Sequence, residues 1–339
     1  MECTKTIKVL VVDDSPFARK ALSAILNSEP GISVVGTADN GKDAIEKALL
    51  LAPDVITMDV RMPGMDGLEA LDIIMQNNPV PVIMVSSIDP KVVMKALSFG
   101  AMDFVSITQD IDTVAKELIE KVKISSRVKP IHRMKFTSKK KEPVKKTEPV
   151  SGFTNIVALG ISTGGPQALK VLIDHIPENF PGSMIIVQHI SEGFIGGLVE
   201  WLKSGNNLDI RVAKTGDELK KGSILFAPDS HHTIVGIDER IAFIDDSNVK
   251  TFHIPSIDVM MMSVAKVYRN RAVGVIMTGM GHDGVEGIKA IKDAGGKTLA
   301  ENEQTSVIYG MNKIAIEKGY INQALPLNEM AEGILKAIT

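Results

Sequence analysis

Short apolar runs alternate with helical segments along residues 1–123, and this alternation constrains the fold more than any other feature of the sequence. After each run, apolar residues recur at helical spacing, as Phe17, Ala21 and Ile25 do after the first. Regular alternation of strands and helices is typical of a parallel sheet with helices on both faces. We therefore expect a first α/β domain over 1–123, with strands at 8–12, 32–35, 54–58, 81–85 and 103–107.

A change of composition separates this domain from the rest of the chain. Residues 124–152 are rich in Lys, Arg, Ser and Pro and show no apolar period, which predicts a basic, flexible linker. The alternation starts again over 153–339 and predicts a second α/β domain, doubly wound and mostly parallel. Strands between 223 and 244 follow one another without helices, which predicts an antiparallel excursion.

Charge and cysteine content exclude several classes of function. The net charge of −3 gives no reason to expect nucleic acid as a partner. A single cysteine, Cys3, rules out an intrachain disulfide and a cysteine-based zinc site, and it fits a reducing cytoplasm. No stretch reaches the ~18–20 apolar residues that span a bilayer, and the run 9–12 is too short for a secretory signal. We therefore expect a cytoplasmic protein without membrane insertion.

Three carboxylates follow two of the expected strands in the first domain. Asp13 and Asp14 follow the strand 8–12, and Asp59 lies in "TMDVRMPGMDG" after the strand 54–58. The carboxyl ends of parallel strands meet at one edge, where three carboxylates repel each other unless a cation lies between them. Mg²⁺ suits such oxygen ligands, and a carboxylate beside it can attack phosphorus to form an acyl phosphate. In the alternative interpretation, each Asp only caps a loop or a helix.

With these motifs, residues 7–123 resemble the receiver domain of response regulators, a flavodoxin-like fold with a five-stranded parallel sheet. The resemblance implies a phosphoacceptor, a Mg²⁺ site in which one carboxylate acts through water, and two switch residues. The phosphoacceptor implied is Asp59, and the switch residues implied are Ser86 and Phe104. The ligands implied for Mg²⁺ are Asp14, Asp59 and the carbonyl of Arg61, with Asp13 acting through water.

One position departs from the receiver pattern. Receivers usually carry Lys-Pro after the fifth strand, where this sequence has Ile107 and Thr108. In that family the lysine pairs with the phosphoryl oxygens and couples phosphorylation to rearrangement. Isoleucine has neither a charge nor a donor. The sequence therefore predicts weakened or altered activation by phosphorylation.

Three residues of the second domain offer the parts of a serine hydrolase. Ser162 lies in "GISTGG", His189 in "MIIVQHI" and Asp283 in "VIMTGMGHDG", each after its own expected strand. A serine hydroxyl needs a base within hydrogen-bond reach, and the base needs a carboxylate that holds its tautomer. The glycines allow a tight turn and free backbone N–H groups for an oxyanion. The spacing leaves open that the three residues are only caps or structural groups, and that His231 or His232 is the base or a ligand.

The segment 279–284 also matches the dinucleotide-binding pattern G-x-G-x-x-G, with Glu301 17 residues beyond Gly284. In that interpretation Asp283 lies where a pyrophosphate must dock. Two like charges ~4 Å apart at an effective dielectric of ~20 repel by about 4 kcal/mol. We therefore prefer a catalytic aspartate at this position to a nucleotide site.

The segments "GISTGGPQAL", "IIVQHI", "ILFAPDSHH", "PSIDVMMMSVA" and "VIMTGMGHDG" resemble the motifs of the chemotaxis protein-glutamate methylesterases, the CheB family. The resemblance implies a nucleophile, a base, an orienting carboxylate, and contacts to the oxyanion or substrate, with no cofactor for the esterase. The nucleophile implied is Ser162, the base is His189 and the orienting carboxylate is Asp283. Thr163 and Met280 are the implied contacts to the oxyanion or substrate. Three positions depart from the family pattern: Asp229 stands where the family usually has Gly, Ile254 where it has Arg, and Asn312 where it has Pro.

What the resemblance implies is a response-regulated hydrolase. It would remove methyl esters from glutamyl residues of methyl-accepting chemoreceptors and deamidate receptor glutamines, under control of a chemotaxis histidine kinase that phosphorylates Asp59. Two other classes stay open at this point. One is a regulator whose C-terminal half only binds a partner or a nucleotide, and the other is an unrelated serine hydrolase.

Overall fold

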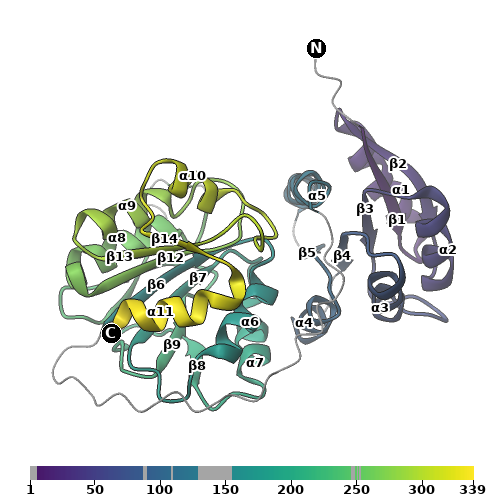
Figure 1. Cartoon of the computed structure of the whole chain (residues 1–339). Helices are drawn as coiled ribbons and strands as arrows, with labels where there is room; N and C mark the ends of the chain where they lie inside the picture. The colour runs from purple at the N-terminus through teal and green to yellow at the C-terminus, as the bar shows by residue number, and fades with distance from the viewer. Residues whose placement is uncertain are drawn as a thin grey trace. The chain divides into compact units, whose positions relative to one another are not determined.

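The computed structural model describes residues 6–86, 90–107, 110–128, 155–245, 249, 251 and 253–339, drawn in Figure 1. They belong to two compact units, one before and one after residues 129–154. Most of the predicted linker, 124–152, therefore lies outside the described residues. In the part of the chain that the structure describes, no helix combines the length and the apolar character that a bilayer crossing needs.

The N-terminal unit is a five-stranded parallel sheet with the strand order β2-β1-β3-β4-β5. This is the flavodoxin-like order, and it confirms the predicted fold. Helices α1 and α5 pack together on one face of this sheet, and α2, α3 and α4 on the other (Figure 1). The elements are β1 (Ile7–Val12), α1 (Pro16–Ser28), β2 (Ile32–Ala38), α2 (Gly41–Leu51), β3 (Val55–Met58), α3 (Gly67–Asn77), β4 (Val82–Ser86), α4 (Pro90–Ser98), β5 (Asp103–Ser106) and α5 (Ile111–Ser125).

Short polar side chains mark where four of these helices begin. Ser15 Oγ accepts the N–H of Ala18 at 3.3 Å, and Pro16 takes the first helical position, where its missing N–H costs nothing. Asn40, Asp66 and Asp110 cap α2, α3 and α5 in the same way. Local sequence therefore sets the helix starts, while the buried strands between the helices form the core of the unit.

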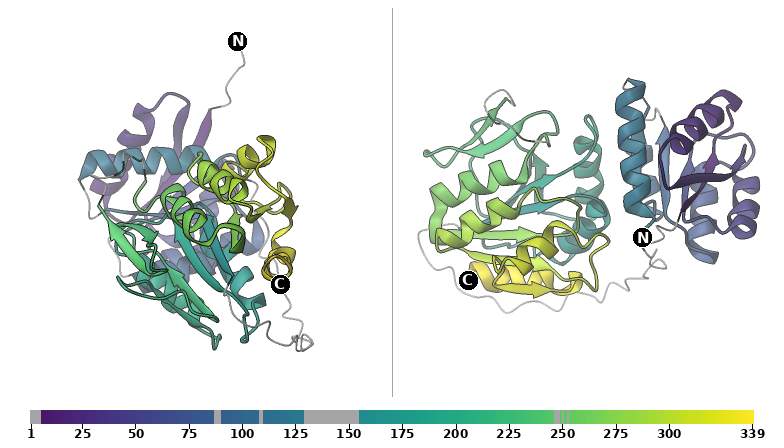
Figure 2. Two further views of the ribbon diagram at one scale, coloured as in Figure 1. Left: turned by 90° about the vertical axis from the view of Figure 1, so that its left-hand side faces the viewer. Right: turned by 90° about the horizontal axis from the view of Figure 1, so that it is seen from above.

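The C-terminal unit is built on a seven-stranded sheet with the order β14-β13-β12-β6-β7-β9-β8, in which all neighbours run parallel. Helices α8, α9 and α10 cover one face and α6, α7 and α11 the other, with α11 drawn in yellow in Figure 2. The strands are β6 (Ile156–Ile161), β7 (Ser183–Gln188), β8 (Asp209–Val212), β9 (Ser223–Phe226), β12 (Ala272–Ile276), β13 (Lys297–Glu301) and β14 (Gln323–Leu325). The helices are α6 (Gly165–His175), α7 (Ile195–Lys203), α8 (Ile257–Tyr268), α9 (Val285–Asp293), α10 (Met311–Glu317) and α11 (Met330–Ile338).

The antiparallel excursion is shorter than the sequence predicts. Among the strands that the structure describes, only β10 (His232–Val235) and β11 (Ile241–Ile244) form an antiparallel pair, while β9 joins the main sheet parallel to β7. All four residues of β9 are buried, as in a strand with helices on both faces, whereas β11 is half-buried. No helix separates β9 from β10 in the sequence, so nothing in the sequence indicated that the two strands belong to different sheets.

Strand β6 lies at the point where the order of the large sheet reverses. The chain runs outward from β6 to β7 on one side and returns later to β12 on the other. Ligands of open α/β sheets bind outside the carboxyl ends of the strands at such a point. The segments that follow β6, β7 and β12 therefore meet at the position where a ligand site is expected.

Candidate active site

Backbone hydrogen bonds bring Ser162 and His189 to this edge of the large sheet, beside the segment after β12 that leads to Asp283. The N–H of Ser162 donates to Thr278 O at 2.9 Å, across the ends of β6 and β12. The N–H of His189 donates to Ile161 O at 3.0 Å, across the ends of β6 and β7. The parallel register thus delivers the residues to neighbouring positions, although 121 positions separate Ser162 from Asp283 in the sequence.

His189 and Asp283 form a direct pair. His189 Nε2 lies 2.9 Å from Asp283 Oδ2, and the two side chains are only 12% and 11% exposed. Ser162 is half-buried, and its Oγ has no hydrogen-bond partner among the described residues. Because Nε2 faces the carboxylate, Nδ1 is the nitrogen of His189 that remains for a serine hydroxyl.

Asp283 lies at the N-terminus of α8, which supplies three donors to its carboxylate. Oδ2 accepts the N–H of Ile257 at 2.8 Å, and Oδ1 accepts the Oγ–H of Ser256 at 2.9 Å and the N–H of Asp258 at 3.0 Å. Burial by itself raises the pKa of Asp283. The bond and charge of His189 and the helix N–H groups outweigh it, so that the pKa lies below its ordinary value. Asp283 is therefore held as a carboxylate.

The two helices on this face exchange acidic caps. Asp258, in the first turn of α8, accepts the N–H groups of Gly284 and Gly287 at 2.9 and 2.6 Å, at the start of α9. Asp283, just before α9, is bound in turn by the start of α8. Burial raises the pKa of Asp258 to about 6, with the neighbouring Asp283 acting in the same direction. The exchange fixes the direction of Asp283, and sequence inspection missed it because Asp258 resembles an ordinary first-turn acid.

Glycines of the turn after β6 allow close packing around Ser162. Gly164 has a φ of 78°, and a Cβ at Gly165 would lie 1.9 Å from Gln188 Oε1. Gln188 Nε2 donates to Ser162 O at 2.9 Å and to His189 O at 2.7 Å, so it joins the two segments. The cap of α6 is Gly164, without a side-chain bond. The alternative in which Ser162 caps this helix is therefore wrong.

Two backbone N–H groups near Ser162 lack acceptors. Those of Thr163 and Met280 donate to none of the described residues. A Cβ at Gly279 would lie 2.7 Å from Ser162 Cβ, which shows how closely the segment before Met280 approaches the serine. The two N–H groups are thus available to an oxygen atom of a ligand.

The two rival histidines take other positions. His232 is fully buried, and its Nδ1 accepts the N–H of Ser256 at 3.0 Å. It thus helps to hold Ser256, which donates to Asp283. His231 is exposed, with Nδ1 2.8 Å from Ser230 Oγ. Neither histidine bonds to Ser162 or Asp283 in the described parts of the chain.

The three carboxylates of the predicted metal site in the N-terminal unit lie together. Carboxylate oxygens of Asp13, Asp14 and Asp59 fall within 4.8 Å of one another. Ser86 Oγ donates to Asp59 Oδ1 at 2.7 Å, and Phe104 is buried. Burial raises the pKa of Asp59, and no Lys or Arg among the described residues forms an ion pair with these carboxylates. A hard divalent cation fits this donor set.

Comparison with known proteins finds relatives of both units. Residues 157–334 match the family model described as CheB methylesterase, and residues 9–119 match the response regulator receiver domain. The chain belongs to the CheB methylesterase family. Proteins named protein-glutamate methylesterase/protein-glutamine glutaminase are similar over nearly their whole length. The relative from Thermotoga maritima is 39% identical (98% of this chain, 99% of the relative), and that from Archaeoglobus fulgidus is 40% identical (97% of each).

A solved structure of the family resembles the C-terminal unit. It is the CheB methylesterase catalytic domain of Thermotoga maritima, 34% identical with a TM-score of 0.52, and the match covers 55% of this chain and 99% of that domain. The α/β fold predicted for this unit is thus found in a relative whose sequence has diverged at two positions in three.

Two departures from the CheB pattern have structural explanations. Asp229 Oδ2 accepts the N–H groups of Gly193 and Ile195 at 2.8 and 3.2 Å, so it holds the segment after His189 and the start of α7. Asn312 is buried, and its Nδ2 donates to Glu301 O at 2.9 Å and to Ser306 Oγ at 2.7 Å. The third, Ile254, is 43% exposed, and nothing in the structure explains it.

The CheB fold also accounts for the glycine-rich segment 279–284. The N–H groups at the start of α9, which a pyrophosphate would use, are bound by Asp258. The carboxylate of Asp283 is bound by the start of α8. Glu301 is buried against the N–H of Thr278 and is not available to a ribose. Both findings count against a dinucleotide site.

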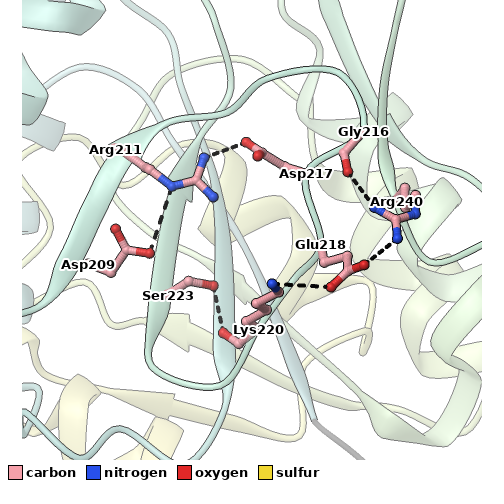
Figure 3. A pocket seen from close by; sticks show the side chains of 8 residues that line it. All are labelled: Asp209, Arg211, Gly216, Asp217, Glu218, Lys220, Ser223 and Arg240. Carbon is pink, nitrogen blue, oxygen red and sulfur yellow. Dashed lines mark hydrogen bonds and ion pairs between the residues drawn. The ribbon is translucent and has the colours of Figure 1, made fainter.

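A polar hollow at one edge of the large sheet is lined by Asp209, Arg211, Gly216, Asp217, Glu218, Lys220, Ser223 and Arg240 (Figure 3). Its cations are already paired, Arg211 with Asp217 and both Lys220 and Arg240 with Glu218. The hollow therefore consists of compensated surface charges.

Replacing Glu301 by Gln should flatten the pH dependence of stability. Burial raises the pKa of Glu301 from 4.5 to about 7, so between these pH values the folded state keeps a proton that the unfolded state loses. The free energy of unfolding then falls as the pH rises, by about 3 kcal/mol in total. Urea unfolding followed by the fluorescence of Trp201, the single tryptophan, measures this at pH 5 and pH 8. An equal decline in Glu301→Gln would contradict the prediction.

Proposed function

We propose that this chain is a protein-glutamate methylesterase and protein-glutamine glutaminase whose substrates are methyl-accepting chemoreceptors. The observation that carries the proposal is the 2.9 Å contact between His189 and Asp283, at the sheet edge where Ser162 follows β6. The names of the whole-length relatives support the same activity. The single cysteine is compatible with a cytoplasmic location, where the signalling parts of chemoreceptors are found.

Ser162 supplies the nucleophile. Its proton moves to Nδ1 of His189 as Oγ attacks the γ-carbonyl of the methyl ester. His189 then protonates the methoxide as its bond to the carbonyl carbon breaks, so that methanol leaves and the acyl group stays bonded to Ser162 Oγ. Water, deprotonated by His189, releases the glutamate and restores Ser162. With glutamine as substrate, ammonia takes the place of methanol.

The N–H groups of Thr163 and Met280 bind the oxyanion that forms at each step. Two observations support this role of the N–H groups. Neither group has a competing acceptor among the described residues, and Gly279, which precedes Met280, lies close to Ser162. Donors that are already oriented contribute roughly 10²–10³ in rate each. Asp283, held by α8, keeps Nε2 of His189 protonated and stabilises the imidazolium.

Phosphorylation of Asp59 by a chemotaxis histidine kinase regulates this activity. Asp14, Asp59 and the carbonyl of Arg61 would hold Mg²⁺, with Asp13 acting through water, and the ion when bound neutralises the carboxylates and phosphoryl oxygens. Ser86, already bonded to Asp59, and the buried Phe104 provide the switch. Without a lysine at position 107, the coupling between phosphorylation and activity is weak.

Ile107→Lys should strengthen activation by phosphorylation. Ile107 is 46% exposed and directly follows β5, and an ammonium group there can pair with the phosphoryl oxygens. The ratio of methanol release with and without phosphodonor should rise about fivefold or more. Ile111→Lys, at an exposed isoleucine of α5, is the matched control. An activation ratio in Ile107→Lys no higher than in the unaltered chain would contradict the proposed coupling.

Release of methanol from methylated receptor membranes is the experiment that tests the function. The full chain should release methanol, and Ser162→Ala should not. Turnover of simple aryl esters without release from receptors would favour an unrelated serine hydrolase. Binding to receptors without turnover of either substrate would favour a regulator that only binds.

A further inference from the structure

A third histidine lies against the predicted catalytic base. The ring of His253 stacks on the ring of His189, with the centroids 4.5 Å apart and the planes 25° from parallel. His253 stands four residues before the start of α8, so the segment that cradles Asp283 also delivers this ring. The sequence offers no signal for the contact, because His189 and His253 are 64 positions apart.

Two contacts of different kinds determine the orientation of His189. The bond from Nε2 to Asp283 fixes one edge of the imidazole but leaves the ring free to rotate about that bond. A stacked neighbour restricts this rotation because it fixes the plane of the ring. Together the two contacts define where Nδ1 points.

We propose that His253 is a positioning residue, whose stacked ring holds the plane of His189 so that Nδ1 faces Ser162. This inference rests on the proposed function, in which His189 is the base. It assigns to His253 a part in the reaction without contact to the substrate. Its effect should therefore be on the rate of the acylation step and not on receptor binding.

The surroundings of His253 favour its neutral form. The titratable groups that act on it are His189 after β7 and His282 and Asp283 after β12. His253 is an exposed residue, so only the part of its ring that lies against the site is withdrawn from water. This partial burial lowers the pKa of His253, the charge on His189 lowers it further, and Asp283 acts in the opposite direction. A neutral ring leaves His189 free to take the proton of Ser162, whereas a charged one would repel that proton.

The test compares His253→Ala and His253→Phe in the full chain, with His231→Ala as the control for removing an exposed histidine. We expect kcat for methanol release to fall roughly 10- to 100-fold in His253→Ala with KM unchanged. His253→Phe, which keeps a flat ring but cannot be protonated, should keep kcat within about threefold above pH 7. Its kcat should also decline less steeply at acid pH, because one titrating group is gone.

A second readout keeps this inference separate from the proposed function. Labelling of Ser162 by a fluorophosphonate reports the serine–histidine chemistry without a receptor. Slower labelling of His253→Ala, restored by Phe, supports the positioning role even if receptors prove not to be substrates. Labelling and kcat of His253→Ala equal to those of His231→Ala would overturn it, as would an increase in KM alone.

Discussion

Ser162→Ala should abolish methanol release from methylated receptors while the fold remains intact. Loss of the nucleophile of a triad costs roughly 10⁴-fold or more in kcat, because no other group can form the acyl intermediate. The fold should tolerate the change, since Ser162 Oγ has no partner among the described residues. The hydrogen bonds of this residue to Thr278, Gly165 and Gln188 are made by its backbone N–H and carbonyl groups. Released methanol and urea unfolding measure the two expectations.

The matched control for this variant is Ser230→Ala. Ser230 is an exposed serine whose Oγ bonds to His231, away from the His189–Asp283 pair. Its removal should leave methanol release unchanged. Undiminished methanol release in Ser162→Ala would show that the pair serves another nucleophile, whereas unfolding of that variant would show that the turn after β6 depends on the hydroxyl.

Asp283→Asn should reduce kcat about 10³- to 10⁴-fold and also weaken the fold. An amide cannot keep Nε2 of His189 protonated or stabilise the imidazolium, so the base has the wrong tautomer. The carboxylate accepts bonds from His189, Ser256 and two N–H groups of α8. Asn has one acceptor oxygen, and its NH₂ would face donors, which costs about 2–4 kcal/mol of unfolding free energy.

The pH dependence of stability distinguishes Asp283 from the neighbouring Asp258. Because the folded pKa of Asp283 is depressed, its contribution is present above the ordinary value of 3.8 and is lost as the pH falls. The pKa of Asp258 is raised to about 6, so ionisation of this group lowers stability as the pH rises from 3.8 to 6. Asp283→Asn should therefore lower the free energy of unfolding by a nearly constant amount between pH 4 and 8. Asp258→Asn should instead reduce the fall in stability that the unaltered chain shows between pH 4 and 6.

Urea unfolding of both variants between pH 4 and 8 measures this contrast. The two variants carry the same chemical change at the ends of adjacent helices, so each is the control of the other. If the free energies of unfolding of the two variants changed in the same way with pH, the prediction that the two carboxylates have oppositely shifted pKa values would be contradicted.

The alternation of apolar runs and helical stripes was sufficient to predict two α/β units, since strand and helix periods are local properties. The placement of Ser162, His189, Asp283 and the cluster with Asp59 at the sheet edges could be predicted, because each follows a recognisable strand and parallel strands bring their ends to one edge. The division of the strands between 223 and 244 could not, since parallel and antiparallel neighbours depend on partners elsewhere in the chain.

The sequence by itself determined which residues reach the edge of each sheet, because turns and strand ends are encoded within a few positions. Only the tertiary structure decided how those residues are held. Asp283 is bound by a helix start 25 to 27 positions away, His232 supports Ser256, and His253 lies on His189. Contacts between distant segments follow from packing, and no local pattern specifies them.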